Sequence, residues 1–389
     1  MTSAAPFSSF DEMSAQARKL FDSAAATCFF SSMPWFTTFA KHALDGGDRI
    51  RIYSVQSGDL AVAPQAALAT VHKVAKSGFF SPRKPSSLSS YYTSLFGMVS
   101  NGADERKTAR ELAKIIATES PRWDEVDLRP LDVNAPAFAA LVEGLQAAGF
   151  VVQTYFCFGN WYSHVNGRSF AEYMEGLPSV LKNTLARKKR KLEKSGRAKI
   201  EIITASDQLD AAIDAYNKVY LASWKQPEPY PNFVPELIRK CAELGALRLG
   251  LIHVDGEPAA AQFWIVENGN ALIYKLAYDE RFADLSVGTI LTAALMQHVI
   301  DVDRVAVVDY LSGDDSYKKD WMAFRRERWG ILALNPRTFR GVAAIVRHVG
   351  GRAVKRFVNS IIKRPGKTEG TPQLTDAKTW NRNKLSSAN

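Results

Sequence analysis

The second half of the chain alternates strand-like and helix-like patterns of hydrophobic residues. Strand-like runs lie at 198–204, 246–254, 258–266, 271–278, 304–311 and 330–336. Apolar residues follow helical spacing at 206–224, 233–245 and 282–300, and we expect 317–329 to be helical as well. The predicted order of elements is therefore βααβββαβαβ.

The first half repeats the tail of this order. We expect strands at 49–56, 60–72, 91–99, 123–131 and 151–158, and helices at 104–119 and 135–149. The resulting βββαβαβ order is shared with the second half without obvious sequence identity. This pattern indicates a duplicated α/β domain.

Three parts follow along the chain. We expect an N-terminal lobe at 1–165, a second lobe at 166–336, and a basic helix with a polar tail at 337–389. The segment 338–367 contains no acidic residue, and its apolar residues follow helical spacing. Such an amphipathic helix could lie on an anionic membrane through 338–364, or its apolar side could pack on the domain. The polar residues 368–389 are expected to be disordered.

Charge and composition narrow the classes of function. The net charge of +10 suits an anionic ligand, a nucleic acid or a membrane surface. The three cysteines form no CxxC pair and the six histidines show no ligand spacing, so we expect neither a disulfide framework nor a metal site. The N-terminus lacks a signal-peptide pattern and no apolar run is long enough to span a bilayer. We expect a cytoplasmic protein, with peripheral contact with the inner membrane left open.

Three segments carry a resemblance to a known superfamily. They are 177-LPSVLKNTLARKKRKLEKSG-196, 271-ALIYKLAYDERFADLSVGTIL-291 and 309-DYLSGDDSYKKDWMAFRRER-328. With the order of elements, they resemble the GNAT acyltransferases, and in particular the Fem peptidyltransferases and the CelD-type acetyltransferases of bacterial envelope-polysaccharide clusters. The resemblance spans roughly 169–336 and implies tandem GNAT-like α/β domains, each a mixed, mostly antiparallel sheet flanked by helices. The superfamily's usual Arg/Gln-x-x-Gly-x-Gly/Ala phosphate loop is absent.

The start of the 282–300 helix is the candidate donor site. Free N–H groups at a helix start bind phosphate, and a glycine lets the ligand approach the backbone. The candidate residues are Ser286, Val287, Gly288 and Thr289. The alternative is an ordinary serine cap. The matching helix of the first half opens with Asp104 and Glu105, which would repel a phosphate, so the donor is expected in the second lobe.

Candidate catalytic residues follow the strand at 304–311, because strand ends in α/β domains face the ligand crevice. Asp309 could take a proton from an acceptor amine, directly or through water, and Tyr310 or Tyr317 could protonate a leaving thiolate. Lys318 could stabilise an oxyanion or hold an anionic substrate. Asp314 and Asp315 could hold a cationic amine, or the segment could be a turn that caps the next helix.

Further residues are candidates for binding the acceptor. By the resemblance, Arg187 and Arg190 of the basic helix would border the acceptor site; the alternative is a solvated helix face. Trp224 and Lys225 lie in a Pro-rich loop that is either a lid or a connector. Tyr278 and Asp279 precede the candidate donor site, or simply end a strand.

The resemblance implies an N-acyltransferase that uses acetyl-CoA or another acyl-CoA as co-substrate and no metal. Its acceptor would be an amino sugar or a lipid-linked precursor of an envelope polysaccharide. One alternative is a Fem-like transferase that takes its acyl group from aminoacyl-tRNA; other nucleic acids are not expected, because no aromatic set interleaves the basic residues. The other is a non-catalytic GNAT-like scaffold at the membrane.

Overall fold

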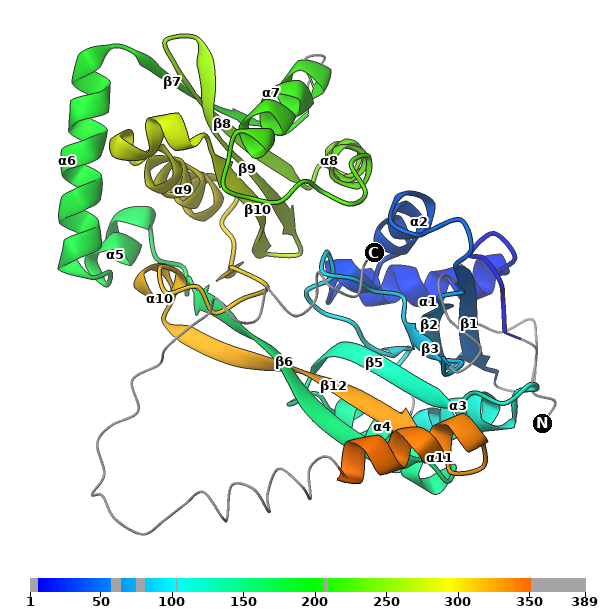
Figure 1. Ribbon diagram of the computed structural model, residues 1–389. Helices are drawn as coiled ribbons and strands as arrows, with labels where there is room; N and C mark the ends of the chain where they lie inside the picture. The colour runs from blue at the N-terminus through cyan, green and yellow to red at the C-terminus, as the bar shows by residue number, and fades with distance from the viewer. Residues whose placement is uncertain (1–5, 57–63, 75–80, 103, 206–208, 351–389) are drawn as a thin grey trace, which may run out of the picture. The chain divides into compact units, whose positions relative to one another are not determined.

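The computed structural model describes residues 6–56, 64–74, 81–102, 104–205 and 209–350. The chain forms one compact unit up to Ala343, and the residues from Ala344 onward form a second unit. Figure 1 shows the strands and helices with the labels used below.

A 12-stranded sheet organises the first unit. Its strands are β1 (Arg49–Val55), β2 (Ala66–His72), β3 (Pro85–Ser87), β4 (Val99–Ser100), β5 (Glu125–Asp132), β6 (Val151–His164), β7 (Ala198–Ile203), β8 (Leu247–Val254), β9 (Glu257–Glu267), β10 (Asn270–Tyr278), β11 (Val307–Asp309) and β12 (Phe324–Leu334). The order is β1-β2-β3-β5-β12-β6-β11-β10-β9-β8-β7, with β4 beside β2. The pairs β3–β5 and β10–β11 are parallel and the other pairs are antiparallel. The expected mixed, mostly antiparallel sheet is confirmed.

The two halves of the chain exchange strands in the middle of this sheet. The last strand, β12, lies between β5 and β6 of the first half, with Leu334 opposite both Glu125 and Val151. In turn, β6 continues to His164 and pairs with β11. One sheet therefore runs through both halves, and this sharing was not expected from the order of elements alone.

Helices cover both faces of the sheet. The helices are α1 (Ala15–Ala25), α2 (Met33–His42), α3 (Glu105–Thr118), α4 (Pro136–Ala147), α5 (Phe170–Glu175), α6 (Ser179–Ser195), α7 (Leu209–Leu221), α8 (Phe233–Glu243), α9 (Val287–Gln297), α10 (Lys318–Trp321) and α11 (Phe339–Ile345). Short 3-10 helices, η1 (Phe29–Ser31) and η2 (Glu280–Leu285), precede α2 and α9, and π-helical turns follow α9 (η3, His298–Val302) and α11 (η4, Val346–Gly350).

Two hydrophobic cores lie on opposite faces of β8–β10. One core packs α9 and α6 against the sheet through residues such as Trp264 and Leu291. The other contains α7 and α8 together with α2 of the first half, where the Trp35 and Phe233 rings lie 5.7 Å apart. Figure 1 shows α9 and α7 on opposite sides of β8–β10. The second core joins the two halves by apolar contact in addition to the shared strands.

Two expectations about elements were wrong, and two helices were missed. The segment 317–329 is not one helix: α10 ends at Trp321 and Phe324 begins β12, because this strand has partners on both sides. The segment 91–99 is not a strand; only Val99 at its end belongs to one, β4. Helices α1 and α2 in the first 48 residues were not predicted.

The expected basic amphipathic helix is described only up to Gly350, as α11 and η4. The remainder of the segment 338–367 and the tail 368–389 lie outside the described residues. On the described part, Phe339, Val342 and Val346 are exposed. Within the described chain, no helix combines the length and apolarity needed to cross a membrane.

Candidate functional site

An open backbone edge forms where β10 and β11 part. The two strands pair only through Asn270–Leu272 and Val307–Asp309, whereas β10 continues to Tyr278. Beyond Leu272, no strand in the described structure pairs with β10 on this side. The pairing of β10 with β9 also shifts register between Ile273 and Lys275. About half of the six residues Ile273–Tyr278 can therefore offer backbone hydrogen bonds to a ligand, because the backbone groups of successive residues point alternately to the open side and to β9.

Helix α9 begins beside the end of this open strand. Ser286 is left-handed (φ 56°), and its side chain makes no capping hydrogen bond, so the alternative of an ordinary serine cap does not hold. The N–H groups of Val287, Gly288 and Thr289 have no acceptor among the described residues. They form the positive end of an 11-residue helix. This helix start can therefore bind an anion.

Gly288 is held close to an aromatic side chain. A Cβ atom added at Gly288 would lie 3.2 Å from Cδ1 of Tyr278. The Gly288 carbonyl accepts hydrogen bonds from Gln262 Nε2 and Thr292 Oγ1, each at 3.0 Å. A larger residue would have to displace the Tyr278 ring, because these bonds fix the backbone.

The Pro-rich loop after α7 brings an aromatic ring and a lysine to the same place. The Trp224 and Tyr278 ring centroids are 4.7 Å apart. Lys225 Nζ lies 5.8 Å from the Trp224 ring and makes no hydrogen bond or ion pair with any described residue. Burial and the charges of Lys275 and Lys318 lower the pKa of Lys225 to about 8. A lysine that contacts only aromatic rings among the described residues thus lies near the aromatic pair beside Gly288.

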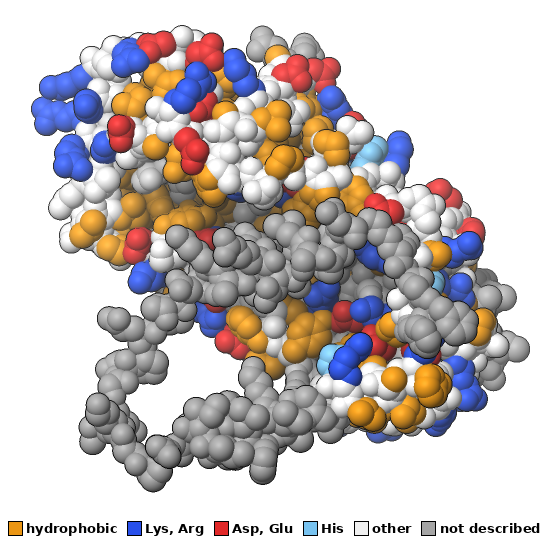
Figure 2. Space-filling model, viewed as in Figure 1, with side chains coloured by type: hydrophobic (Ala, Val, Ile, Leu, Met, Phe, Trp, Pro, Cys, Tyr) orange, Lys and Arg blue, Asp and Glu red, His pale blue; other side chains and the backbone are white. Residues whose placement is uncertain are grey.

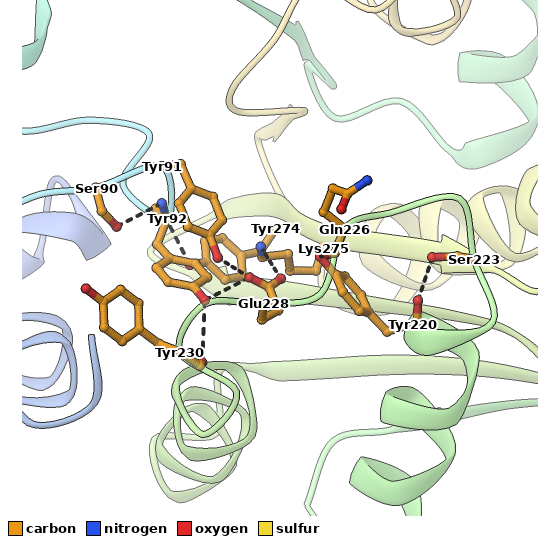
Figure 3. Close-up of polar contacts among 10 residues, drawn as sticks. All are labelled: Ser90, Tyr91, Tyr92, Tyr220, Ser223, Gln226, Glu228, Tyr230, Tyr274 and Lys275. Carbon is orange, nitrogen blue, oxygen red and sulfur yellow. Dashed lines mark hydrogen bonds and ion pairs between the residues drawn. The ribbon is translucent and has the colours of Figure 1, made fainter. Parts of the chain in front are cut away.

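A buried carboxylate ties this loop to the first half of the chain (Figure 3). Glu228 accepts hydrogen bonds from Lys275 Nζ at 2.8 Å, from Tyr92 at 2.7 Å, and from the Tyr91 hydroxyl. Burial opposes ionisation, but the Lys275 charge and these hydrogen bonds hold the pKa of Glu228 below its usual value. Sequence reasoning missed these four residues. Their only local signal was the acid inside 224-WKQPEPYP-231.

The structure also brings together most of the predicted residues after β11. The Tyr310 and Tyr317 rings meet edge to face at 5.8 Å, and Lys318 Nζ lies 5.8 Å from the Tyr310 ring. Lys318 is buried and pairs with Asp315 at 3.2 Å. Burial lowers the pKa of Lys318, and burial together with Asp315 raises that of Tyr317. Tyr317 therefore keeps its proton at neutral pH.

Asp309 is buried and already has partners. Its carboxylate accepts hydrogen bonds from Asn160 Nδ2 at 2.5 Å and from the Leu311 amide at 2.6 Å, and pairs with Arg326. The proposed role of Asp309 as a base stays a prediction. These contacts would require a water molecule to carry the proton.

Four other predicted residues lie apart from this group. Asp314 pairs with Arg325 at 2.7 Å, and Asp279 caps η2 and pairs with Arg281. Arg187 and Arg190 are exposed on α6, where basic side chains gather in Figure 2. Within the described part of the chain, no cluster of His, Cys, Asp and Glu could hold a metal ion.

Comparison with known proteins finds one family model that matches part of the second half. Residues 179–319 match the model of the family described as "Acetyltransferase (GNAT) domain". No curated protein matches the chain.

Two solved structures share the fold at low sequence identity. The alignment with FemX covers 81% of this chain and 95% of the FemX chain at 11% identity (TM-score 0.54). The alignment with a conserved protein of unknown function from Bacteroides thetaiotaomicron covers 82% of this chain and 92% of that chain at 12% identity (TM-score 0.51). A third, less similar structure is a tandem GNAT protein from the clavulanic acid biosynthesis pathway; its alignment covers 86% of this chain and 99% of that chain at 14% identity (TM-score 0.48). Residues 179–319 therefore form a GNAT-type domain, and this domain supports an acyltransferase.

Proposed function

We propose that the protein transfers an acetyl or other acyl group from acyl-CoA to an amine. The observation that supports this proposal is the start of α9, where three N–H groups that have no acceptor in the described structure adjoin the open edge of β10. We further propose an amino sugar or another precursor of a bacterial envelope polysaccharide as the acceptor. This choice rests on the sequence resemblance.

The residues present fit a CoA-type donor. The N–H groups of Val287, Gly288 and Thr289 would bind the pyrophosphate, and Lys225 would add a positive charge nearby. The unpaired edge of β10 from Ile273 would hydrogen-bond to the amide groups of the donor's arm. When bound, the donor supplies the acyl thioester.

The transfer breaks the acyl C–S bond and forms a C–N bond to the acceptor. The amine must lose a proton and the leaving thiolate must gain one. Tyr317 is the candidate donor of the second proton, because it is protonated and 41% exposed. Asp315 is the exposed carboxylate beside Lys318 and could attract an ammonium group. Asp309, through water, remains the predicted base.

A basic stripe on α6 favours a second candidate, transfer from aminoacyl-tRNA. The stripe begins at Arg187 and continues three, four and seven positions later with Arg190, Lys191 and Lys194. All four side chains are exposed, and none has an ion-pair partner among the described residues. They also border one surface depression. Such a stripe would attract a phosphate backbone, and binding would weaken steeply with salt.

The exposed apolar residues of α11 support a peripheral membrane contact by a cytoplasmic protein. Phe339 is 84% exposed, and Val342 and Val346 follow it at helical spacing. A non-catalytic scaffold would use the same contact. Unlike the enzyme, it would be indifferent to acyl donors.

An assay for free thiol tests the proposal. The full chain is incubated with acetyl-CoA and amino sugars, and thiol release is followed with and without each acceptor. We expect release that depends on an acceptor and falls at least tenfold in Tyr317→Phe. The absence of both acyl-CoA binding and thiol release, over a broad panel of amines, would favour the scaffold. Product formation only from aminoacyl-tRNA would favour the second candidate.

A further inference from the structure

A cavity lies away from the start of α9 and is lined by Leu272 and Asp309. It measures about 280 Å³ and extends from β10, β11 and β12 to the segment around Cys28 and the loop at Ser94. Ligand pockets span roughly 300–1,000 Å³, and a water molecule takes up about 30 Å³. The cavity is therefore large enough for a small organic molecule.

A polar network forms the floor of this cavity. Arg326 and Arg328 alternate along β12 and both donate to Asn160 Oδ1, at 2.7 and 3.2 Å. Arg326 also pairs with Asp309, and Arg328 Nη1 lies 2.8 Å from Asp132. These contacts fix both guanidinium groups, because each is bound from two sides.

Two buried groups that line the cavity lack partners. Arg328 is only 2% exposed, and neither its Nε nor its Nη1 has a hydrogen-bond partner in the described structure, although Nη1 forms the ion pair with Asp132. The Oε2 atom of Glu267 at the end of β9 is likewise buried without one. Burial raises the pKa of this carboxyl group. Donors on Arg328 and an acceptor on Glu267 that lack hydrogen-bond partners among the described residues are costly in one cavity unless a ligand or water satisfies them.

The charges indicate which ligand would satisfy both groups. Three acids, Asp132, Glu267 and Asp309, line the cavity against two arginines. Both arginines have carboxylate partners, so Glu267 is the unmatched charge. An ammonium group would neutralise Glu267, and an oxygen acceptor would receive the Arg328 Nε proton.

We propose that this cavity binds a small primary amine that carries a hydrogen-bond-accepting oxygen, with Glu267 holding the amine and Arg328 the oxygen. Amino acids and amino sugars share this chemistry. The proposal does not depend on the donor site at α9, since it concerns binding alone.

Calorimetric titration of the full chain, without any acyl donor, tests the proposal. The probes are the twenty standard L-amino acids, glucosamine and galactosamine. N-acetylglucosamine and acetate serve as analogues without the amine, and ethylamine as the analogue without the oxygen. Which of the probes binds shows whether the ligand is an amino acid or an amino sugar.

We expect at least one probe to bind, its truncated analogues to bind at least tenfold more weakly, and Glu267→Gln to weaken binding at least tenfold. Glu257→Gln is the matched control, because Glu257 lies at the other end of β9 in an exposed pair with Lys218. Should Glu267→Gln fail to fold, Glu267→Asp replaces it, and the analogues still test the claim. No binding by any probe, equal binding by an analogue, or full affinity in a folded Glu267 variant would overturn the proposal.

Discussion

Glu228 and Lys275 form an ion pair of 2.8 Å in which both side chains are nearly buried, with 10% and 12% of their surfaces exposed. Glu228 belongs to the loop after α7 and Lys275 to β10. Tyr91 and Tyr92 of the first half bind the same carboxylate (Figure 3). The pair therefore positions the loop that carries Trp224 and Lys225.

Replacing Glu228 should destabilise the protein. We expect Glu228→Gln to lower the free energy of unfolding by about 2 kcal/mol, because Lys275 loses its charged partner in a mostly buried position. The matched control is Glu257→Gln, whose exposed pair with Lys218 should contribute at most about 0.5 kcal/mol. Urea unfolding measures both variants. Equal losses in the two would show that the Glu228 pair has no special role.

The same pair should give an acid dependence of stability. The pKa of Glu228 is lower in the folded chain than the unfolded value of about 4.3. Its contribution is therefore present above about pH 4 and is lost as pH falls through the folded pKa. Unfolding measured from pH 6 to pH 3 should show a smaller loss in Glu228→Gln than in the wild type. Parallel curves would contradict this assignment.

The order of elements could be predicted because each element had a local signal. Helix α3 and strands β8–β10 lie within two residues of their predicted bounds. The exchange of β6 and β12 has no such signal, because pairing partners far apart in sequence decide it. Pairing with β5 and β6 also explains why the charged segment that begins at Phe324 forms a strand.

The site was predictable only where one segment forms it. The start of α9 follows a strand directly, so Gly288 and its neighbours could be named from the sequence. The Glu228 cluster joins residues 136 and 137 positions apart. The spacing of hydrophobic residues within one segment does not predict a contact between segments so far apart. Tyr91 and Tyr92 were expected in a strand.

Lys225 should make donor binding depend on pH. Its pKa of about 8 means that its charge disappears as pH rises through that value. We expect the Kd of acetyl-CoA to increase about tenfold between pH 7 and pH 9.5, the effect of losing one charge-assisted hydrogen bond. Lys225→Arg should bind tightly and Lys225→Met weakly, both with little pH dependence. An unchanged pH dependence in Lys225→Met would assign it to another group.

The α6 stripe should matter for polyanions and not for stability. We expect Arg187→Ala with Arg190→Ala to leave the melting temperature unchanged, because both side chains are exposed and unpaired among the described residues. If tRNA binds, the double variant should bind more weakly, with a shallower salt dependence between 50 and 200 mM. Lys218→Ala with Lys240→Ala is the control on other helices. An equal effect in the control would indicate general charge attraction.

The apolar stripe of α11 should act at membranes. We expect liposomes rich in anionic lipid to retain the full chain, and to retain Phe339→Ser with Val342→Ser less well, because both apolar side chains are exposed. Sedimentation with liposomes measures retention. No retention, or equal retention of a chain that ends at Pro336, would contradict the membrane contact.

The most direct test of the donor site is a titration with acetyl-CoA, longer acyl-CoAs and free CoA that follows the melting temperature. It compares the wild type with Gly288→Glu, which places a negative side chain at the start of α9 beside the Tyr278 ring. Gly288→Ala controls for the added Cβ atom. We predict that acyl-CoA raises the melting temperature of the wild type and leaves that of folded Gly288→Glu unchanged. The absence of a shift in the folded wild type with every CoA species, or an equal shift in Gly288→Glu, would contradict a donor site at this helix start.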